Sequence, residues 1–102
     1  MKSSLFALAV CAVSAFSVTA AQASSAGEKI FAQKCTMCHK VNGKGGVMGP
    51  DLSKVSAKFK EADLKAKIEN PKQSTPSSTM PAFKSLPKAD MDALMAYMKT
   101  LK

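Results

Sequence analysis

The sequence predicts an all-α fold, and three observations lead to this prediction. No stretch of the chain alternates between apolar and polar residues as a half-buried strand does. Near the C-terminus, residues 88–101 repeat apolar side chains at the spacing of a helix. The chain has 102 residues, enough for one small domain. A few helices packed around a single interior are therefore the expected architecture.

The beginning of the chain has the features of an export signal. Lys2 supplies a positive charge, residues 5–18 form an apolar run, and Ala21-Gln22-Ala23 has the small-x-small pattern at which signal peptidases cut. The apolar run is shorter than the roughly 20 residues that cross a bilayer. We therefore predict a cleaved signal peptide over residues 1–23 with no stable membrane anchor, and a mature domain over residues 24–102.

The first predicted helix covers residues 26–34. Phe31 gives it an apolar side chain for the interior, and Ser24 or Ser25 is suited to cap its start. Residues 41–50 follow and contain four glycines, so we predict that they form a loop.

A second helix is predicted over residues 61–70. Leu64 and Ile68 stand four positions apart and so share one face, and Pro71 directly after the segment is a stop signal. Residues 72–79 are polar and hydroxyl-rich, which predicts a surface loop.

The last predicted helix, residues 88–101, is the most strongly periodic part of the chain. Pro87 is acceptable at its start, where its missing N–H group costs no hydrogen bond. Its apolar stripe consists of Met91, Leu94, Met95, Met98 and Leu101. A stripe of this kind is typical of a helix that buries one face in a core.

The run Cys35-Thr36-Met37-Cys38-His39 carries the chemistry of the chain. Two thiols three positions apart can add to the two vinyl groups of a haem when the chain between them is turned, and the adjacent imidazole can then bind the iron. This pattern is typical of c-type haem attachment. In bacteria this attachment takes place outside the cytoplasm, so export to the periplasm is the expected route.

Two other interpretations of this run agree less well with the sequence. A structural zinc site takes four ligands, whereas the mature chain offers two cysteines and one histidine. A thioredoxin-like redox pair belongs to a βαβ setting, and no strand is predicted. We therefore predict one covalently attached haem c, bound at Cys35 and Cys38, with His39 as an iron ligand.

The second axial ligand of the iron must be another residue type, because His39 is the only histidine. Methionine is the natural candidate. Met37 lies inside the attachment run, Met48 is tethered close to His39, and the methionines of the last helix fit a core stripe. Met80 lies in a loop far enough along the chain to wrap around the haem. We predict Met80 as the sixth ligand, with Met48 as the next candidate.

These residues resemble the small class I c-type cytochromes of bacteria over the whole mature chain. Met80-Pro81-Ala82-Phe83 is similar to the methionine-ligand loop of that family, and Gly49-Pro50-Asp51-Leu52 is similar to its segment beside the histidine. The resemblance implies the cytochrome c fold, three to four short helices wrapped around one covalently bound haem. It also implies that the Pro50 carbonyl accepts a hydrogen bond from the ligand imidazole.

The resemblance extends to the first and last predicted helices. Gly27 and Phe31 match the first-helix positions that pack against the last helix in that family, and Leu94 and Tyr97 match the facing positions. The resemblance therefore implies that the first and last helices pack against each other through these positions.

The charge of the chain indicates its partners. Its 15 basic residues outnumber 7 acidic ones, and every basic residue is lysine. Nucleic-acid binders favour the bidentate fork of arginine, so no nucleic-acid partner is expected. Scattered lysines suit transient docking on an acidic redox protein through long-range attraction.

Taken with the resemblance, these features predict a monomeric, monohaem electron carrier that is not an enzyme, its iron bound by His39 and Met80. One alternative is a sensor or enzyme in which the methionine is labile and the iron binds a small molecule. The other is a haem-bearing subunit of a larger oxidoreductase.

Overall fold

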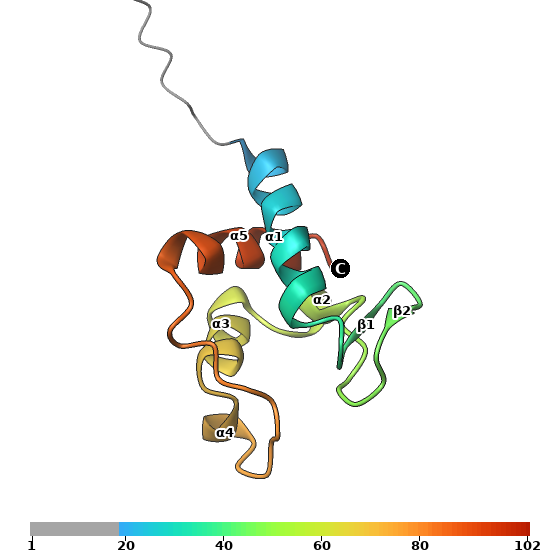
Figure 1. The fold of residues 1–102 in the computed structure, drawn as a ribbon, viewed down its shortest axis with the longest axis vertical. Helices are drawn as coiled ribbons and strands as arrows, with labels where there is room; N and C mark the ends of the chain where they lie inside the picture. The colour runs from blue at the N-terminus through green and yellow to red at the C-terminus, as the bar shows by residue number, and fades with distance from the viewer. Residues whose placement is uncertain (1–18) are drawn as a thin grey trace, which may run out of the picture.

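The computed structural model describes residues 19–102, so most of the predicted signal peptide lies outside the described residues. The elements are α1 (Ala20–Lys34), β1 (Lys40–Val41), β2 (Lys44–Gly45), α2 (Val55–Lys58), α3 (Glu61–Glu69), α4 (Pro71–Ser74) and α5 (Lys88–Met98) (Figure 1). The predicted all-α class is confirmed, although this part of the chain holds five helices rather than three or four. None of these helices has the length and apolarity needed to cross a membrane.

Helix α1 begins at Ala20, earlier than predicted. The Gln22 amide donates a hydrogen bond to the Thr19 hydroxyl (3.3 Å), and the Thr19 amide donates one to the Gln22 side chain (3.1 Å). This reciprocal pair is a capping box. In the uncleaved chain the prediction of a start at residue 26 with a cap at Ser24 or Ser25 is therefore wrong, because the alanine-rich stretch before those serines is itself helical. Cleavage after Ala23 would remove this capping box.

Helices α1 and α5 pack closely where they cross, as the resemblance implies (Figure 1). Gly27 is buried at the crossing, and a Cβ atom there would overlap the Ala93 carbonyl and lie 2.8 Å from the Tyr97 Cβ. One turn later, the Phe31 and Tyr97 rings pack at a tilt of 57° with their centroids 5.3 Å apart. The absence of a side chain at Gly27 therefore sets how closely the two helices approach.

Replacing Gly27 with alanine should destabilise the fold. The new Cβ would meet the backbone of Ala93, which cannot rotate away as a side chain can. We expect the free energy of unfolding to fall by about 1–3 kcal/mol, as is usual for overpacked interiors, measured by urea titration of the haem-loaded protein. Ser25→Ala, at an exposed position of the same helix, is a suitable control. An unchanged urea midpoint for Gly27→Ala would contradict the close crossing.

Strands β1 and β2 form a short antiparallel hairpin within the segment that was predicted to be entirely loop. The turn residues Asn42 and Gly43 both have positive φ values, 50° and 82°. Asn-Gly is the preferred pair for such a two-residue turn. The register pairs Lys40 with Gly45 and Val41 with Lys44. Strands of two residues are too short to show alternation, so only the Asn-Gly pair signals this hairpin in the sequence.

Two single-turn helices, α2 and α4, were not predicted. In α4 the first residue is Pro71, a favoured position for proline, yet the sequence analysis took it only as a stop signal for α3. Helix α5 ends at Met98, although Leu101 is still buried beyond it.

The apolar core draws on α1, α3 and α5 together with single residues from β1, from α2 and from the segment after α5. Its buried members are Phe31, Val41, Val55, Leu64, Ile68, Met91, Leu94, Met95, Met98 and Leu101. The whole predicted stripe of the last helix is among them, so its assignment to the core is confirmed.

Candidate functional site

The site begins where α1 ends. Cys35 is the C-terminal cap of the helix, and its amide donates to the Phe31 carbonyl (2.8 Å). The amides of Cys38 and His39 then both donate to the Cys35 carbonyl, at 3.2 and 3.0 Å. These bonds close one further turn, so the two thiols and the imidazole all come from a single turn of the chain. Both cysteines are unbridged and half-buried.

The environment of Cys35 differs from that of a redox-active thiol. Burial raises the pKa of Cys35 to about 11, and the nearby Lys34 charge opposes this rise only in part. Catalytic and redox thiols have lowered pKa values, because the thiolate is the reactive form. Cys35 therefore stays a neutral thiol near neutral pH.

His39 is buried, and its ring is held in one orientation. Its Nδ1 atom lies 2.9 Å from the Pro50 carbonyl oxygen, so the Nδ1–H group donates to that carbonyl. This is the hydrogen bond that the resemblance implies. No hydrogen bond to Nε2 is found in residues 19–102. Nε2 therefore keeps its lone pair for a metal, and the bond at Nδ1 makes the imidazole a stronger donor.

Gly49 allows the chain to run along the face of this imidazole. A Cβ atom at Gly49 would overlap the ring, at 2.7 Å from Nδ1 and 3.0 Å from Nε2. The Gly49 amide also donates to the Cys38 carbonyl (2.7 Å), which ties this segment to the attachment turn. This role of Gly49 was not predicted, although its position directly before Pro50 is a signal for it in the sequence.

Replacing Gly49 with alanine should therefore disturb the iron ligand. The methyl group would displace the imidazole and weaken its bond to the Pro50 carbonyl. We expect the haem-loaded variant to show a shifted reduction potential and altered NMR shifts of the histidine ring, measured by redox titration and by NMR of the oxidised protein. Val47→Ala, at an exposed neighbouring position, is the control. Spectra and potential equal to those of the parent protein would contradict this role for Gly49.

The candidate methionines differ in how much of each side chain is exposed to solvent. Met37 and Met48 are 85% and 82% exposed, so neither thioether is enclosed. The three methionines of α5 are fully buried in the core. Met80 is half-buried and packs against the core. Among the six methionines of residues 24–102, Met80 alone is neither enclosed in the core nor fully exposed.

The loop that carries Met80 is held in place by the fold. The Met80 amide donates to the Ser78 hydroxyl (3.2 Å), and the Phe83 amide donates to the Ile68 carbonyl on α3 (2.9 Å). The side chains of Phe83 and Leu86 pack against the same core. The loop is thus anchored to α3 and to the core directly after the methionine.

Comparison with known proteins shows to which family this chain belongs. The model of the family described as Cytochrome c matches residues 24–102, the same range as the predicted mature domain. The chain belongs to the cytochrome c family. Members of this family bind haem c, which contains iron, and are generally electron carriers rather than enzymes.

A curated relative is cytochrome c oxidase subunit 2 of Alkalihalophilus pseudofirmus, strain OF4. It is 33% identical over 85 residues, which cover 74% of this chain and 25% of the relative. This chain therefore spans about a quarter of the length of that relative.

The residues of this cytochrome c domain fit a covalently attached haem. Two unbridged thiols and an imidazole come from one turn, and the imidazole keeps Nε2 for iron while Pro50 holds Nδ1. Thioether sulfur and imidazole nitrogen are both ligands that haem iron accepts. When bound, the haem supplies an iron centre that takes up and releases single electrons. The protein holds the ligand geometry and limits access of water.

Proposed function

We propose that this cytochrome is a monomeric, periplasmic carrier of single electrons, released from its signal peptide after Ala23. One observation carries the proposal: Met80, half-buried in an anchored loop, is the thioether suited to oppose the oriented His39 imidazole. Iron with both axial positions filled by protein is suited to electron transfer rather than to binding a substrate. The sensor and enzyme alternatives need an open or labile position, which a fixed Met80 would close.

A second candidate function is supported by the curated relative. That protein is named as a subunit of cytochrome c oxidase, so the present domain is alternatively a haem-bearing module of a larger oxidoreductase. Purification of the native protein separates the two. A carrier would elute alone at the size of its own chain, whereas a module would elute with the larger enzyme.

The lysine surplus supports docking on acidic redox partners. The full chain has a net charge of +8, of which Lys2 in the predicted signal peptide contributes one unit. The three ion pairs found in residues 19–102 neutralise only part of the lysines. Such a field raises the encounter rate with a negatively charged protein.

Electron transfer between the haem-loaded protein and its native partner should therefore slow as salt is added. The Debye length falls from about 30 Å at 0.01 M to about 8 Å at 0.15 M ionic strength. We expect the bimolecular rate to fall by about tenfold or more over this range, measured by stopped-flow absorbance. An uncharged small-molecule reductant is the control and should show little change. A flat or rising rate with the native partner would contradict docking through the lysines on an acidic partner.

A further inference from the structure

Two methionine side chains of this domain are almost fully exposed. Met37 and Met48 have 85% and 82% of their surface accessible to solvent. Methionine is usually buried, because its flexible thioether fills gaps between apolar side chains. Neither the core nor the proposed ligation of iron uses these two thioethers. Their chemistry in water is therefore open to another role.

The backbone holds the two exposed methionines on neighbouring segments. The amides of Gly46 and Gly49 donate to carbonyls of the attachment turn, at 2.8 and 2.7 Å. A Cβ atom at Gly46 would also overlap the Met37 carbonyl. The segment between these glycines carries Met48, so it runs directly against the turn that carries Met37. We call these two residues the methionine pair.

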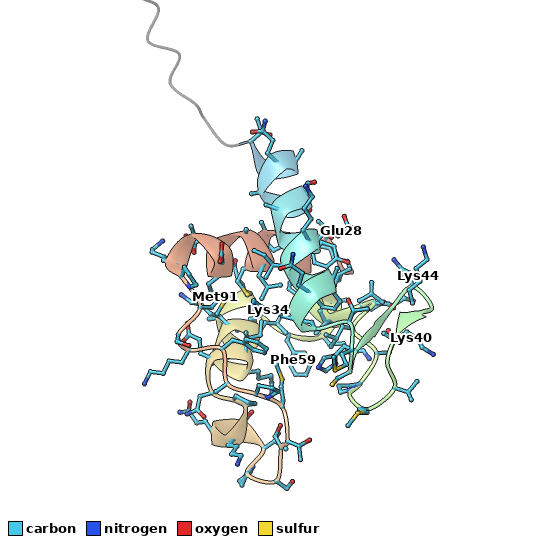
Figure 2. All side chains as sticks on the ribbon, viewed as in Figure 1. Glu28, Lys34, Lys40, Lys44, Phe59 and Met91 are labelled. Carbon is cyan, nitrogen blue, oxygen red and sulfur yellow. The ribbon has the colours of Figure 1, made fainter. Side chains whose placement is uncertain are left out.

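The other methionines of residues 24–102 are sheltered from solvent. The three methionines of α5 are at most 5% exposed. Figure 2 shows Met91, one of the three, on the opposite side of the molecule from the hairpin lysines Lys40 and Lys44. Met80 is half-buried, and in the proposed carrier its thioether is bound to iron. A reagent in solution therefore reaches two of the six thioethers freely.

Exposure determines what oxidation of a thioether does to the fold. Oxygen transfer converts the apolar methionine side chain into a polar sulfoxide. In the core, this group would be buried without a hydrogen-bond partner and would destabilise the protein. At the methionine pair the sulfoxide oxygen stays in water. Oxidation there leaves both the core and the iron site unchanged.

The segment around Met48 is also open to a repair enzyme. Val47 beside it is 79% exposed. Within residues 19–102, the Val47 and Met48 amides donate no backbone hydrogen bond. An enzyme can therefore grip this short stretch by its side chains and its backbone without breaking the fold.

We propose that the methionine pair is a reversible oxidation site, which takes an oxygen atom from hypochlorous acid and leaves the Met80 thioether intact. In the oxidation step, a thioether and hypochlorous acid give a sulfoxide, chloride and a proton. Sulfur loses two electrons and chlorine gains them. In the return step, a methionine sulfoxide reductase supplies two thiols, which become a disulfide while the sulfoxide oxygen leaves as water. This removal of an oxidant goes beyond the carrier function.

The test treats the haem-loaded protein with a small molar excess of hypochlorous acid at neutral pH, followed by free methionine to stop the reaction. Mass spectrometry of proteolytic peptides then gives the sulfoxide fraction at each methionine. We expect Met37 and Met48 to carry about tenfold more sulfoxide than any other methionine. The optical spectrum and the reduction potential should stay those of the untreated protein. Methionine sulfoxide reductases of both epimer specificities, with dithiothreitol, should then restore the two thioethers.

Two double variants show whether the methionine pair is the oxidant sink. Met37→Leu with Met48→Leu removes the exposed thioethers and keeps apolar side chains of similar size, so it should lose most of the fast consumption of hypochlorous acid in stopped-flow absorbance. Met91→Leu with Met95→Leu is the matched control, because it removes two buried thioethers by replacements that cores tolerate. The control should consume the oxidant like the parent protein.

Each outcome supports or overturns the proposal. Sulfoxide concentrated at Met37 and Met48 and removed by the reductases supports it. Oxidation of Met80 at the same dose, with a ferric spectrum shifted toward high spin, would overturn the claim that the iron ligand is spared. Sulfoxides that the reductases leave in place would overturn reversibility. Parent-like consumption by Met37→Leu with Met48→Leu would show that the oxidant reacts elsewhere.

Discussion

Replacing Cys35 or Cys38 with serine should leave a chain that holds haem by one bond or loses it, and that is largely unfolded without it. A domain of this size buries only about 60% of the surface that its unfolded chain exposes, so its core alone gives little stability. Small exported domains usually need further stabilisation, for example by disulfides or a bound metal. Here Cys35 and Cys38 are unbridged and free to attach a haem, and a covalently attached haem would supply this stabilisation.

The measurement for the cysteine variants is far-ultraviolet circular dichroism during urea titration. We expect a weak helical signal without a cooperative transition for the haem-free chain. Thr79→Ala, at an exposed loop position, is the control and should unfold like the parent protein. A haem-free variant that unfolds cooperatively with parent-like helix content would contradict the idea that haem stabilises this fold.

Replacing Met80 with alanine should change the iron site more than any other single methionine substitution. Loss of the thioether opens the sixth position to water or added ligands. Methionine stabilises the ferrous state, so the reduction potential should fall, and the ferric spectrum should shift toward high spin. Optical spectra and a redox titration measure both effects. Met80→His should remain low-spin at a lower potential, because imidazole stabilises ferric iron better than a thioether does.

Two other methionines serve as controls for the ligand assignment. Met48→Ala, at an exposed position, should leave the iron spectrum and the stability unchanged. Met95→Ala should also leave the spectrum unchanged, but it removes a fully buried side chain, so stability should fall by about 2–5 kcal/mol. If Met80→Ala retains the parent spectrum and potential, the assignment is wrong and Met48 becomes the next candidate.

The helices that the sequence analysis found are those with a repeating apolar face. The stripe of α5 and the Leu64–Ile68 pair of α3 are buried as predicted. Helices α2 and α4 were not predicted, because a single turn is too short to show a repeating pattern of apolar residues. The start of α1 was misplaced because the serines at residues 24 and 25 are good capping residues, and the competing capping box at Thr19 was not considered.

The candidate site was predictable where covalent chemistry requires residues close together in sequence. The run from Cys35 to His39 is of this kind, and the structure shows it as one turn. The role of Pro50 came from the resemblance, and the structure contains the corresponding hydrogen bond. The contacts of Gly49 with the imidazole and of Gly46 with the Met37 carbonyl depend on how distant segments pack, so spacing alone could not reveal them.

The most direct test of the central claim is the intact mass of the protein, purified from a host that attaches haem and then denatured in acid. We predict the mass of a chain that starts at Ser24 with one haem bound, and a proteolytic peptide over residues 35–39 that still carries it. The mass of the bare chain, or of a chain with a disulfide between Cys35 and Cys38, would contradict the claim that this domain carries a covalently attached haem.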